Sequence, residues 1–256
     1  MDIDYRIVIP TKDRSNIILK KTLGFLIKHK IDLSKVDILL GQHCEAEEYR
    51  KVLDGIWDYE FIYHYEGNLG TIMNFVRGYY KYETNVKYLL RLDDDIDEII
   101  DRHNKPIEDF NKLIIDMFRY TEDKDLCYWG IAPFDNYYFL KDKITTDLKF
   151  IVGPLNGEII NRDKHDIQID TDEYEDSAFT CEFFLRDGGV VRHNGYGVVT
   201  KFNAKGGMVS AYGDKKRRLK EMNEKVYHLK DRYGEMINIV EKKHRLDIRL
   251  NRTFKC

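Results

Sequence analysis

The first 92 residues alternate between short apolar runs and amphipathic stretches, and this alternation limits the folds that the chain can adopt. The apolar runs predict strands at 3–10, 36–40, 61–65 and 86–92. Helical spacing predicts helices from Ser15 or Asn16 to about 27, from 45 to 53, and from 70 to 80. Strands that alternate with helices form βαβ units. We therefore expect an α/β fold with a mostly parallel sheet flanked by helices.

The second half of the sequence is less regular and predicts a small antiparallel region. The expected elements are helices at 107–120 and 176–185, β-rich runs at 127–134, 137–140, 150–160 and 190–192, a glycine-rich segment at 199–212, a charged helix at 214–232 and a β region at 237–250. The composition turns basic near residue 205. We expect one domain at 1–205 and a basic helical and β extension at 206–256 packed on it.

Composition narrows the class of protein further. The net charge of −3 excludes a polycation as a whole, but lysine and arginine crowd the last third, which predicts a local basic face for a polyanion. No run approaches about 20 apolar residues, so no membrane span is expected. No secretory signal is visible, and the four cysteines are scattered without a CxxC pair. These features predict a cytoplasmic protein, in the host cell if the source is viral.

Three consecutive carboxylates, Asp93, Asp94 and Asp95, directly follow the fourth predicted strand. Carboxylate oxygens are ligands that Mg²⁺ and Mn²⁺ prefer. Side chains two apart on an extended chain point to the same side, so Asp93 and Asp95 are expected together and Asp94 opposite. Such a pair can hold a divalent ion against a diphosphate. The alternative is an ordinary solvated acidic loop.

A second acidic cluster, Glu173, Glu175 and Asp176, opens a predicted helix about eighty residues later. Acidic residues at a helix start complement the helix dipole, which is the structural explanation. The functional explanation makes Glu175 or Asp176 a general base that deprotonates an acceptor hydroxyl. The choice between the two residues depends on geometry.

Four motifs in order resemble those of GT-A glycosyltransferases, over roughly residues 5 to 195. They are Ile7-Val8-Ile9-Pro10-Thr11-Lys12-Asp13-Arg14, Glu66-Gly67-Asn68-Leu69-Gly70, Leu90-Arg91-Leu92-Asp93-Asp94-Asp95, and Glu175-Asp176-Ser177-Ala178-Phe179 with the Phe184 to Val191 stretch after it. They look like the first strand with its nucleotide-binding loop, an N-x-G helix start, the DxD metal site and the segment that carries the catalytic base. The resemblance implies a GT-A, Rossmann-like fold.

The resemblance also implies roles for individual residues. Asp13 would contact the uracil or ribose of a UDP-sugar donor. Asp93 and Asp95 would hold Mg²⁺ or Mn²⁺ and the donor sugar, with His193 as a candidate third ligand. Asp176 would be the base, with Glu175 beside it, and direct attack would invert the anomeric centre. The other implied donor-binding residues are Pro10, Thr11, Arg14, Asn68, Gly70 and Asp94.

The last third is similar to the TET/J-binding-protein-associated glycosyltransferases, a GT-A branch of phages and trypanosomes that modifies hydroxymethylated pyrimidines in DNA. The likeness lies in the Lys-Phe-Asn…Lys-Gly-Gly-Met stretch at 201–208 and the basic helix after it. It implies UDP-glucose as donor and DNA as partner. The implied DNA-binding residues are Lys201, Phe202, Lys205, Lys215, Lys216, Arg217 and Arg218; cations would neutralise phosphates and Phe202 would stack on a base.

Three other functions are open to the sequence. A GT-A enzyme could act on a glycan, lipid or protein acceptor. The fold could also serve as a non-catalytic nucleic-acid-binding module, which the retained acids Asp93, Asp95 and Asp176 disfavour. A Rossmann-like nucleotidyltransferase would need a glycine-rich phosphate loop after the first strand, and 11–14 contains no glycine. The sequence leaves the oligomeric state open.

Overall fold

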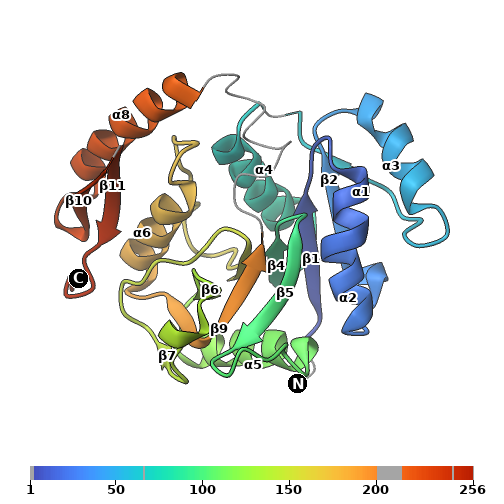
Figure 1. Ribbon diagram of the computed structural model, residues 1–256, viewed down its shortest axis with the longest axis horizontal. Coiled ribbons are helices and arrows are strands. Elements are labelled where there is room, and N and C mark those ends of the chain that lie inside the picture. The colour runs from blue at the N-terminus through green and yellow to red at the C-terminus, as the bar shows by residue number, and fades with distance from the viewer. Residues whose placement is uncertain (1–2, 66, 201–214, 244, 256) are drawn as a thin grey trace.

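A nine-stranded sheet forms the centre of the computed structural model, which describes residues 3–65, 67–200, 215–243 and 245–255 (Figure 1). Its strands are β1 (Tyr5–Pro10), β2 (Val36–Leu40), β3 (Ile62–Tyr63), β4 (Tyr88–Leu92), β5 (Ile96–Asp101), β6 (Tyr128–Ala132), β7 (Ile144–Thr145), β8 (Leu155–Ile159) and β9 (Val191–Thr200). They lie in the order β3-β2-β1-β4-β8-β6-β9-β5, and β7 pairs with β9. Strands β1 to β4 are parallel to one another, while β8 runs antiparallel between β4 and β6.

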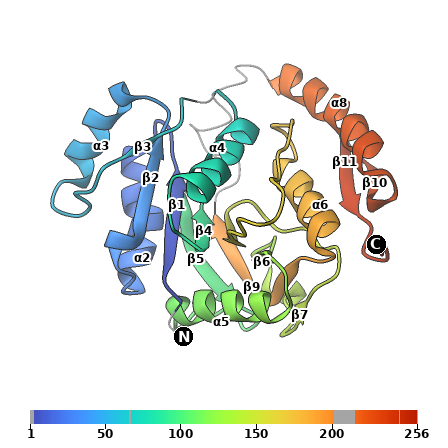
Figure 2. The same ribbon diagram turned by 180° about the vertical axis from the view of Figure 1, so that it is seen from behind.

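Helices cover the sheet. They are α1 (Ser15–Ile18), a π-helical turn (Leu19–Leu23) and α2 (Gly24–Lys28) in one continuous segment, then α3 (Ala46–Leu53), α4 (Leu69–Tyr82), α5 (Phe110–Asp123), α6 (Glu175–Asp187) and α8 (Lys215–Tyr233). Short 3₁₀ turns occupy Leu33–Lys35, His43–Glu45, Tyr137–Phe139 and Gly234–Met236. Helix α4 lies on one face of the parallel strands and α1 and α2 on the other (Figures 1 and 2). The expected α/β fold with a mostly parallel sheet is confirmed.

The apolar strands are buried because helices cover both faces. In β1, Ile7, Val8 and Ile9 are fully buried, although consecutive side chains point to opposite faces. One close approach depends on glycine: a Cβ on Gly157 of β8 would overlap the Trp129 indole of β6. This packing explains why these strands contain continuous apolar runs rather than an alternating pattern.

The C-terminal segment packs on the same apolar core. Helix α8 leads into a hairpin of β10 (Ile237–Lys242) and β11 (Arg245–Leu250), which form a separate two-stranded sheet. Apolar side chains of the segment that belong to the main core are Leu229, Tyr233, Met236, Ile237 and Leu250. The division at residue 205 stays a prediction. No helix in the described parts of the chain is both long and apolar enough to cross a membrane.

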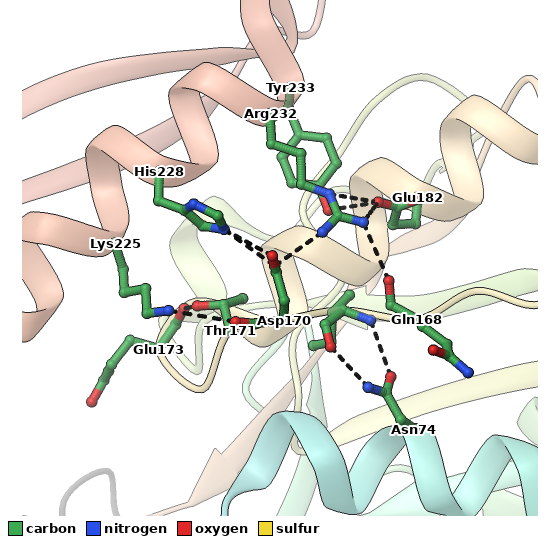
Figure 3. Close-up of polar contacts among 11 residues, drawn as sticks. Asn74, Gln168, Asp170, Thr171, Glu173, Glu182, Lys225, His228, Arg232 and Tyr233 are labelled. Carbon is green, nitrogen blue, oxygen red and sulfur yellow. Dashed lines mark hydrogen bonds and ion pairs between the residues drawn. The ribbon is translucent and has the colours of Figure 1, made fainter.

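Polar contacts also fix α8 to the segment before α6 (Figure 3). Arg232 donates to Asp170 at 3.0 Å and to Glu182 of α6 at 2.6 Å. His228 contacts Asp170 at 3.2 Å, and the Tyr233 hydroxyl donates to Glu182 at 2.9 Å. Helix α8 therefore holds the loop that leads into α6.

Several sequence-based elements were wrong in type or length. The strand expected at 137–140 is a 3₁₀ turn, because the Asn136 side chain accepts the backbone N–H of Tyr138. Strand β5 was not predicted, since acidic residues interrupt its apolar pattern. The short strand expected at 190–192 extends to 200 as β9. A Cβ on Gly197 would overlap the Phe134 carbonyl, so this glycine lets the strand pass that backbone. The rest of the glycine-rich segment, 201–212, lies outside the described residues.

Candidate functional site

A cleft of about 1480 Å³ opens at the carboxyl ends of the parallel strands. The turn after β4 and the first turn of α6 contribute carboxylates to it, and the loop after β1 forms one side. Strand β11 and the residues that follow it form another side. The two acidic groups that the sequence singled out therefore meet in one cavity, although about eighty residues separate them.

The acidic turn after β4 is held in place by a buried threonine. The Thr22 hydroxyl donates to the Asp93 carbonyl at 2.7 Å and accepts the Ile96 N–H at 3.0 Å. Thr22 belongs to the π-helical turn and is fully buried. This residue was not singled out from the sequence, because nothing local connects it with a turn more than seventy positions later.

Asp94 is the buried member of the three carboxylates. The Thr11 hydroxyl donates to Asp94 Oδ2 at 2.7 Å. Because the Thr11 proton is used there, the Tyr49 hydroxyl donates to Thr11 Oγ1 at 2.9 Å, and it accepts the Arg14 N–H at 3.0 Å. Burial raises the pKa of Tyr49 to about 12, so this hydroxyl keeps its proton. The network joins the loop after β1 to the acidic turn.

Arg14 and Thr200 position Asp95. The Arg14 guanidinium donates through Nη1 to Asp94 at 2.8 Å and to Asp95 at 3.3 Å. The Thr200 hydroxyl at the end of β9 donates to Asp95 Oδ1 at 2.5 Å. The Asp95 side chain keeps 13% of its surface exposed. It is therefore oriented by two partners and still borders the cleft.

Asp93 faces the cleft, and its negative charge is only weakly balanced by neighbouring cations. Its side chain is 35% exposed, and Arg91 Nη2 donates to it at 3.2 Å. Protein nevertheless surrounds the carboxyl closely enough that burial, reinforced by the charges of Asp95 and Asp94, raises its pKa to about 6. A divalent cation at this position would relieve the repulsion.

Glu175 and Asp176 begin α6 on the opposite wall. Tyr174 before them has a φ of 63°, a left-handed conformation that costs a non-glycine residue free energy. Its hydroxyl donates to the Leu246 carbonyl of β11 at 3.2 Å. The hairpin therefore contacts the residue that immediately precedes the two acids.

The two acids differ in their hydrogen bonds. Asp176 Oδ1 accepts the Ser177 N–H at 2.8 Å, and the Gly153 backbone also favours its ionised form. Burial still raises the pKa of Asp176 to about 6. Burial and the neighbouring Asp176 raise the pKa of Glu175 well above its usual range. Arg91, which borders the cleft, opposes these increases electrostatically, as it does that of Asp93.

Most of the donor-binding residues expected from the sequence border this cleft. They are Pro10, Thr11, Asp13, Arg14, Asn68, Asp93, Asp94 and Asp95. Asp13 is exposed and has a φ of 55°. The Asn68 side chain caps α4 by accepting the Thr71 N–H at 2.9 Å.

Gly70 does not border the cleft. A Cβ there would overlap the Thr171 carbonyl oxygen, so this glycine allows the first turn of α4 to pack against the segment before α6. Its place in the sequence motif has a packing explanation.

The structure does not bring His193 to the carboxylates. His193 pairs with Ile144 of β7 and Ile131 of β6, and its Nδ1 accepts the Gly195 N–H at 3.1 Å. The residue of β9 that borders the cleft is Thr200, seven positions later. His193 is not among the residues that border the cleft, and the acid that acts on it electrostatically is Asp142. We exclude His193 from the candidate metal site.

The side chains of most of the residues expected to bind DNA lie outside the part of the chain that the structure describes. Lys201, Phe202 and Lys205 lie outside the described residues, as do the side chains of 215–217. Arg218 borders the cleft, and its guanidinium donates to Glu173 at 2.8 Å. This ion pair joins α8 to the acidic segment before α6.

Comparison with known proteins identifies the fold. No protein-family model and no curated protein matches the sequence. The mannosyltransferase PcManGT from Pyrobaculum calidifontis, solved with GDP-Man and Mn²⁺, superimposes with a TM-score of 0.51 and 11% identity over 88% of this chain. The chain has a GT-A-like fold. It spans 63% of the PcManGT chain. The structure of S. aureus TarS 1–349 matches 89% of this chain, and 73% of that chain is covered, at 13% identity and a TM-score of 0.47.

The carboxylates of this GT-A-like fold could hold a divalent metal between Asp93 and Asp95. Across residues 3–65, 67–200, 215–243 and 245–255, no three His, Cys, Asp or Glu side chains are grouped closely enough to form a metal site alone. A Mg²⁺ site usually takes one or two protein carboxylates and completes its shell with phosphate oxygens and water. Two hard ligands that border a wide cleft suit this kind of site.

Basic residues of the hairpin region also border the cleft, and sequence reasoning did not select them. They are Lys242, Arg245, Arg249 and Arg252. Asp247 accepts ion pairs from Lys242 and Arg245. The period-two spacing of 245, 247 and 249 could have indicated a charged strand face. The sequence could not show that this face meets the acidic turn.

Proposed function

We propose that this protein is a metal-dependent glycosyltransferase that uses a nucleotide-sugar donor. The observation that carries the proposal is the meeting of the acids after β4 with those that open α6 in one cleft. Metal-binding carboxylates beside a base are what transfer of a sugar from a nucleoside diphosphate requires. The likeness to PcManGT, which was solved with GDP-Man and Mn²⁺, supports this class of donor and cofactor.

The donor is proposed to occupy the side of the cleft formed by the loop after β1 and the turn after β4. In open α/β sheets, ligands bind beyond the carboxyl ends of the strands. Asp13 would contact the base or ribose, and Asp93 and Asp95 would hold Mg²⁺ or Mn²⁺. When bound, the ion would stabilise the negative charge of the leaving nucleoside diphosphate. Arg14 would keep Asp94 and Asp95 in the required orientation.

Asp176 is the proposed base. Two backbone groups favour its ionised form, whereas burial and the neighbouring Asp176 raise the pKa of Glu175 well above its usual range. Asp176 would accept the proton of the acceptor hydroxyl as its oxygen attacks the anomeric carbon. The bond from that carbon to the diphosphate oxygen would break, and direct attack would invert the configuration.

The proposed acceptor is a 5-hydroxymethylpyrimidine in DNA, with glucose from UDP-glucose as the transferred sugar. The basic side chains that border the cleft, including Arg249 and Arg252, support a polyanionic acceptor. A base inside a duplex cannot reach such a cleft, so the enzyme would flip it out. A glycan, lipid or protein acceptor is the alternative for the same catalytic site.

The test combines the purified protein with Mn²⁺, a panel of nucleotide-sugars and hydroxymethylated DNA. Mass spectrometry of the digested DNA should show one added hexose per modified base. Asp93→Asn and Asp176→Asn should each lower the rate at least about a hundredfold, as expected for loss of a charge-stabilising group or a base. Asp163→Asn, an exposed acid outside the cleft, is the matched control and should retain full activity.

The outcomes separate the levels of the proposal. Metal-dependent hydrolysis of a nucleotide-sugar without DNA modification would refute the DNA acceptor and leave a glycosyltransferase. Absence of both hydrolysis and Mn²⁺ binding would refute the enzymatic function.

A further inference from the structure

A cluster of three cations lies beside the cleft with one carboxylate among them. Its members are Lys149 in the segment between β7 and β8, Arg192 in β9, and Arg252 after β11. Arg252 acts electrostatically on both Lys149 and Arg192, and Asp147 is the acid that partly offsets them. Positive charges from three separate parts of the chain therefore gather in one place.

Arg192 is buried and Lys149 is half-buried. Arg192 is only 4% exposed, and the Lys149 side chain is 14% exposed. Arg192 donates to Phe150 O at 3.1 Å and to Asn194 at 2.9 Å. Lys149 donates to Thr145 Oγ1 at 2.9 Å and lies 3.1 Å from Asp147. Neutral oxygens thus take most of their hydrogen bonds, and one carboxylate serves both charges.

The electrostatic cost of this arrangement is visible in the basic groups themselves. Burial, reinforced by Arg252, lowers the pKa of Arg192 to about 10. Burial also lowers the pKa of Lys149, and Arg192 and Arg252 add to the effect. Positive charges that are close together and partly removed from water repel one another, which raises the free energy of their charged forms. A bound anion would offset this repulsion.

The cluster meets the cleft through Arg252, on the side opposite the proposed donor. Arg252 and Phe150 both border the cleft, and Arg192 contacts the Phe150 carbonyl. In Figure 1, β1 and β2 lie to the right of β4, whereas the hairpin lies at the far left, beyond α6. An anion at the cluster would therefore sit on the hairpin side of the acids, where an acceptor would approach.

We propose that Lys149, Arg192 and Arg252 form a binding site for one phosphate group of the acceptor. The inference rests on the proposed function only in naming the ligand as part of an acceptor. Phosphate suits the site because its several oxygens can accept from guanidinium groups in the fork geometry that arginine provides. Arg252 would contact the phosphate directly, and Lys149 and Arg192 would supply charge from behind it.

The test measures binding of a fluorescent single-stranded oligonucleotide to the full-length protein by anisotropy at low salt. Arg252→Ala should bind about tenfold more weakly than the wild type, as expected for loss of one charge-assisted contact. The slope of log Kd against log salt should fall by about 0.7, the value for one phosphate contact on a single strand. Arg119→Ala removes the same charge from an exposed site on α5 and should match the wild type. Arg252→Lys should recover part of the affinity.

Two further probes identify what the site binds. A methylphosphonate oligonucleotide of the same sequence has an uncharged backbone and should bind wild type and Arg252→Ala equally. Inorganic tripolyphosphate should compete with DNA for the wild type, and Arg252→Ala should weaken that competition. If tripolyphosphate binds through Arg252 while DNA does not bind, the phosphate site stands and the DNA acceptor is refuted.

The phosphate site is overturned if Arg252→Ala and Arg119→Ala bind both phosphate probes equally, or if the wild type binds neither. Metal-dependent hydrolysis of the nucleotide-sugar, measured in parallel, reports on the proposed enzyme independently. Arg119→Ala, which lies outside the cleft, should leave this hydrolysis unchanged.

Discussion

Replacing the proposed base should make the protein more stable while it abolishes activity. Burial raises the pKa of Asp176 from 3.8 to about 6. The folded protein therefore holds a proton that the unfolded chain releases between these two values. Well below pH 4 the carboxyl is protonated in both states and does not affect the free energy of unfolding. As the pH rises toward about 6, the unfolded chain ionises more readily than the folded protein, so the free energy of unfolding falls, and above about 6 the loss is complete.

The size of this cost follows from the pKa. Each pKa unit corresponds to about 1.36 kcal/mol, so full ionisation of Asp176 costs at most about 3 kcal/mol. The group borders an open cleft, and solvent screening reduces the value to about 1–2 kcal/mol. Asparagine keeps an oxygen that can accept the Ser177 N–H, so Asp176→Asn removes mainly the charge.

The assay is urea denaturation of wild type and Asp176→Asn at pH 4, 6 and 8 in the presence of EDTA. The variant should unfold with a free energy about 1–2 kcal/mol higher at pH 8 and within about 0.5 kcal/mol of the wild type at pH 4. Asp163→Asn, an exposed acid, is the control and should show no such pH-dependent gain. A variant that is less stable at pH 8, or a gain of the same size at every pH, would refute the reasoning.

Two further predictions test the packing and the electrostatics of the site. Gly70→Ala should lower the free energy of unfolding by about 1–3 kcal/mol in urea, because its Cβ overlaps the Thr171 carbonyl. Gly78→Ala, on the same helix but with open space around it, should raise that energy by about 0.5–1 kcal/mol; similar values for both variants would contradict the structure. Arg91→Met removes the cation that lowers the pKa of Asp93 and Asp176, so the acidic limb of the pH–rate profile should move to higher pH by about one unit. An unmoved limb would show that neither acid controls the rate.

Much of the fold could be predicted because its signals are local. The apolar runs that became β1, β2 and β4 lie within the predicted ranges, since a strand covered by helices on both faces must be apolar along its length. Strand β5 lacked such a signal. It is stabilised by antiparallel pairing with β9, which follows it in the chain by nearly a hundred residues.

The candidate site was predictable in its carboxylates and in the loop after β1, but not in the residues that position the acids. Consecutive acids after an apolar strand form a visible pattern. Thr22, Tyr49 and Thr200 position those acids, but each is an ordinary residue whose role arises from a distant contact. The prediction of His193 as a metal ligand was wrong because it relied on residue type alone. Histidine suits a metal, but this one lies at a point along β9 that does not border the cleft.

The order of apolar and polar residues by itself determined that the chain forms a helix-covered sheet with acids at strand and helix ends. Hydrophobic burial and backbone hydrogen bonding impose short-range periodicities, and these can be read from neighbouring residues. Tertiary structure alone decided that the two acidic groups share a cleft with the hairpin, and that Lys149, Arg192 and Arg252 gather beside it. Electrostatic interactions depend on distance in space, and the folded path of the chain sets that distance.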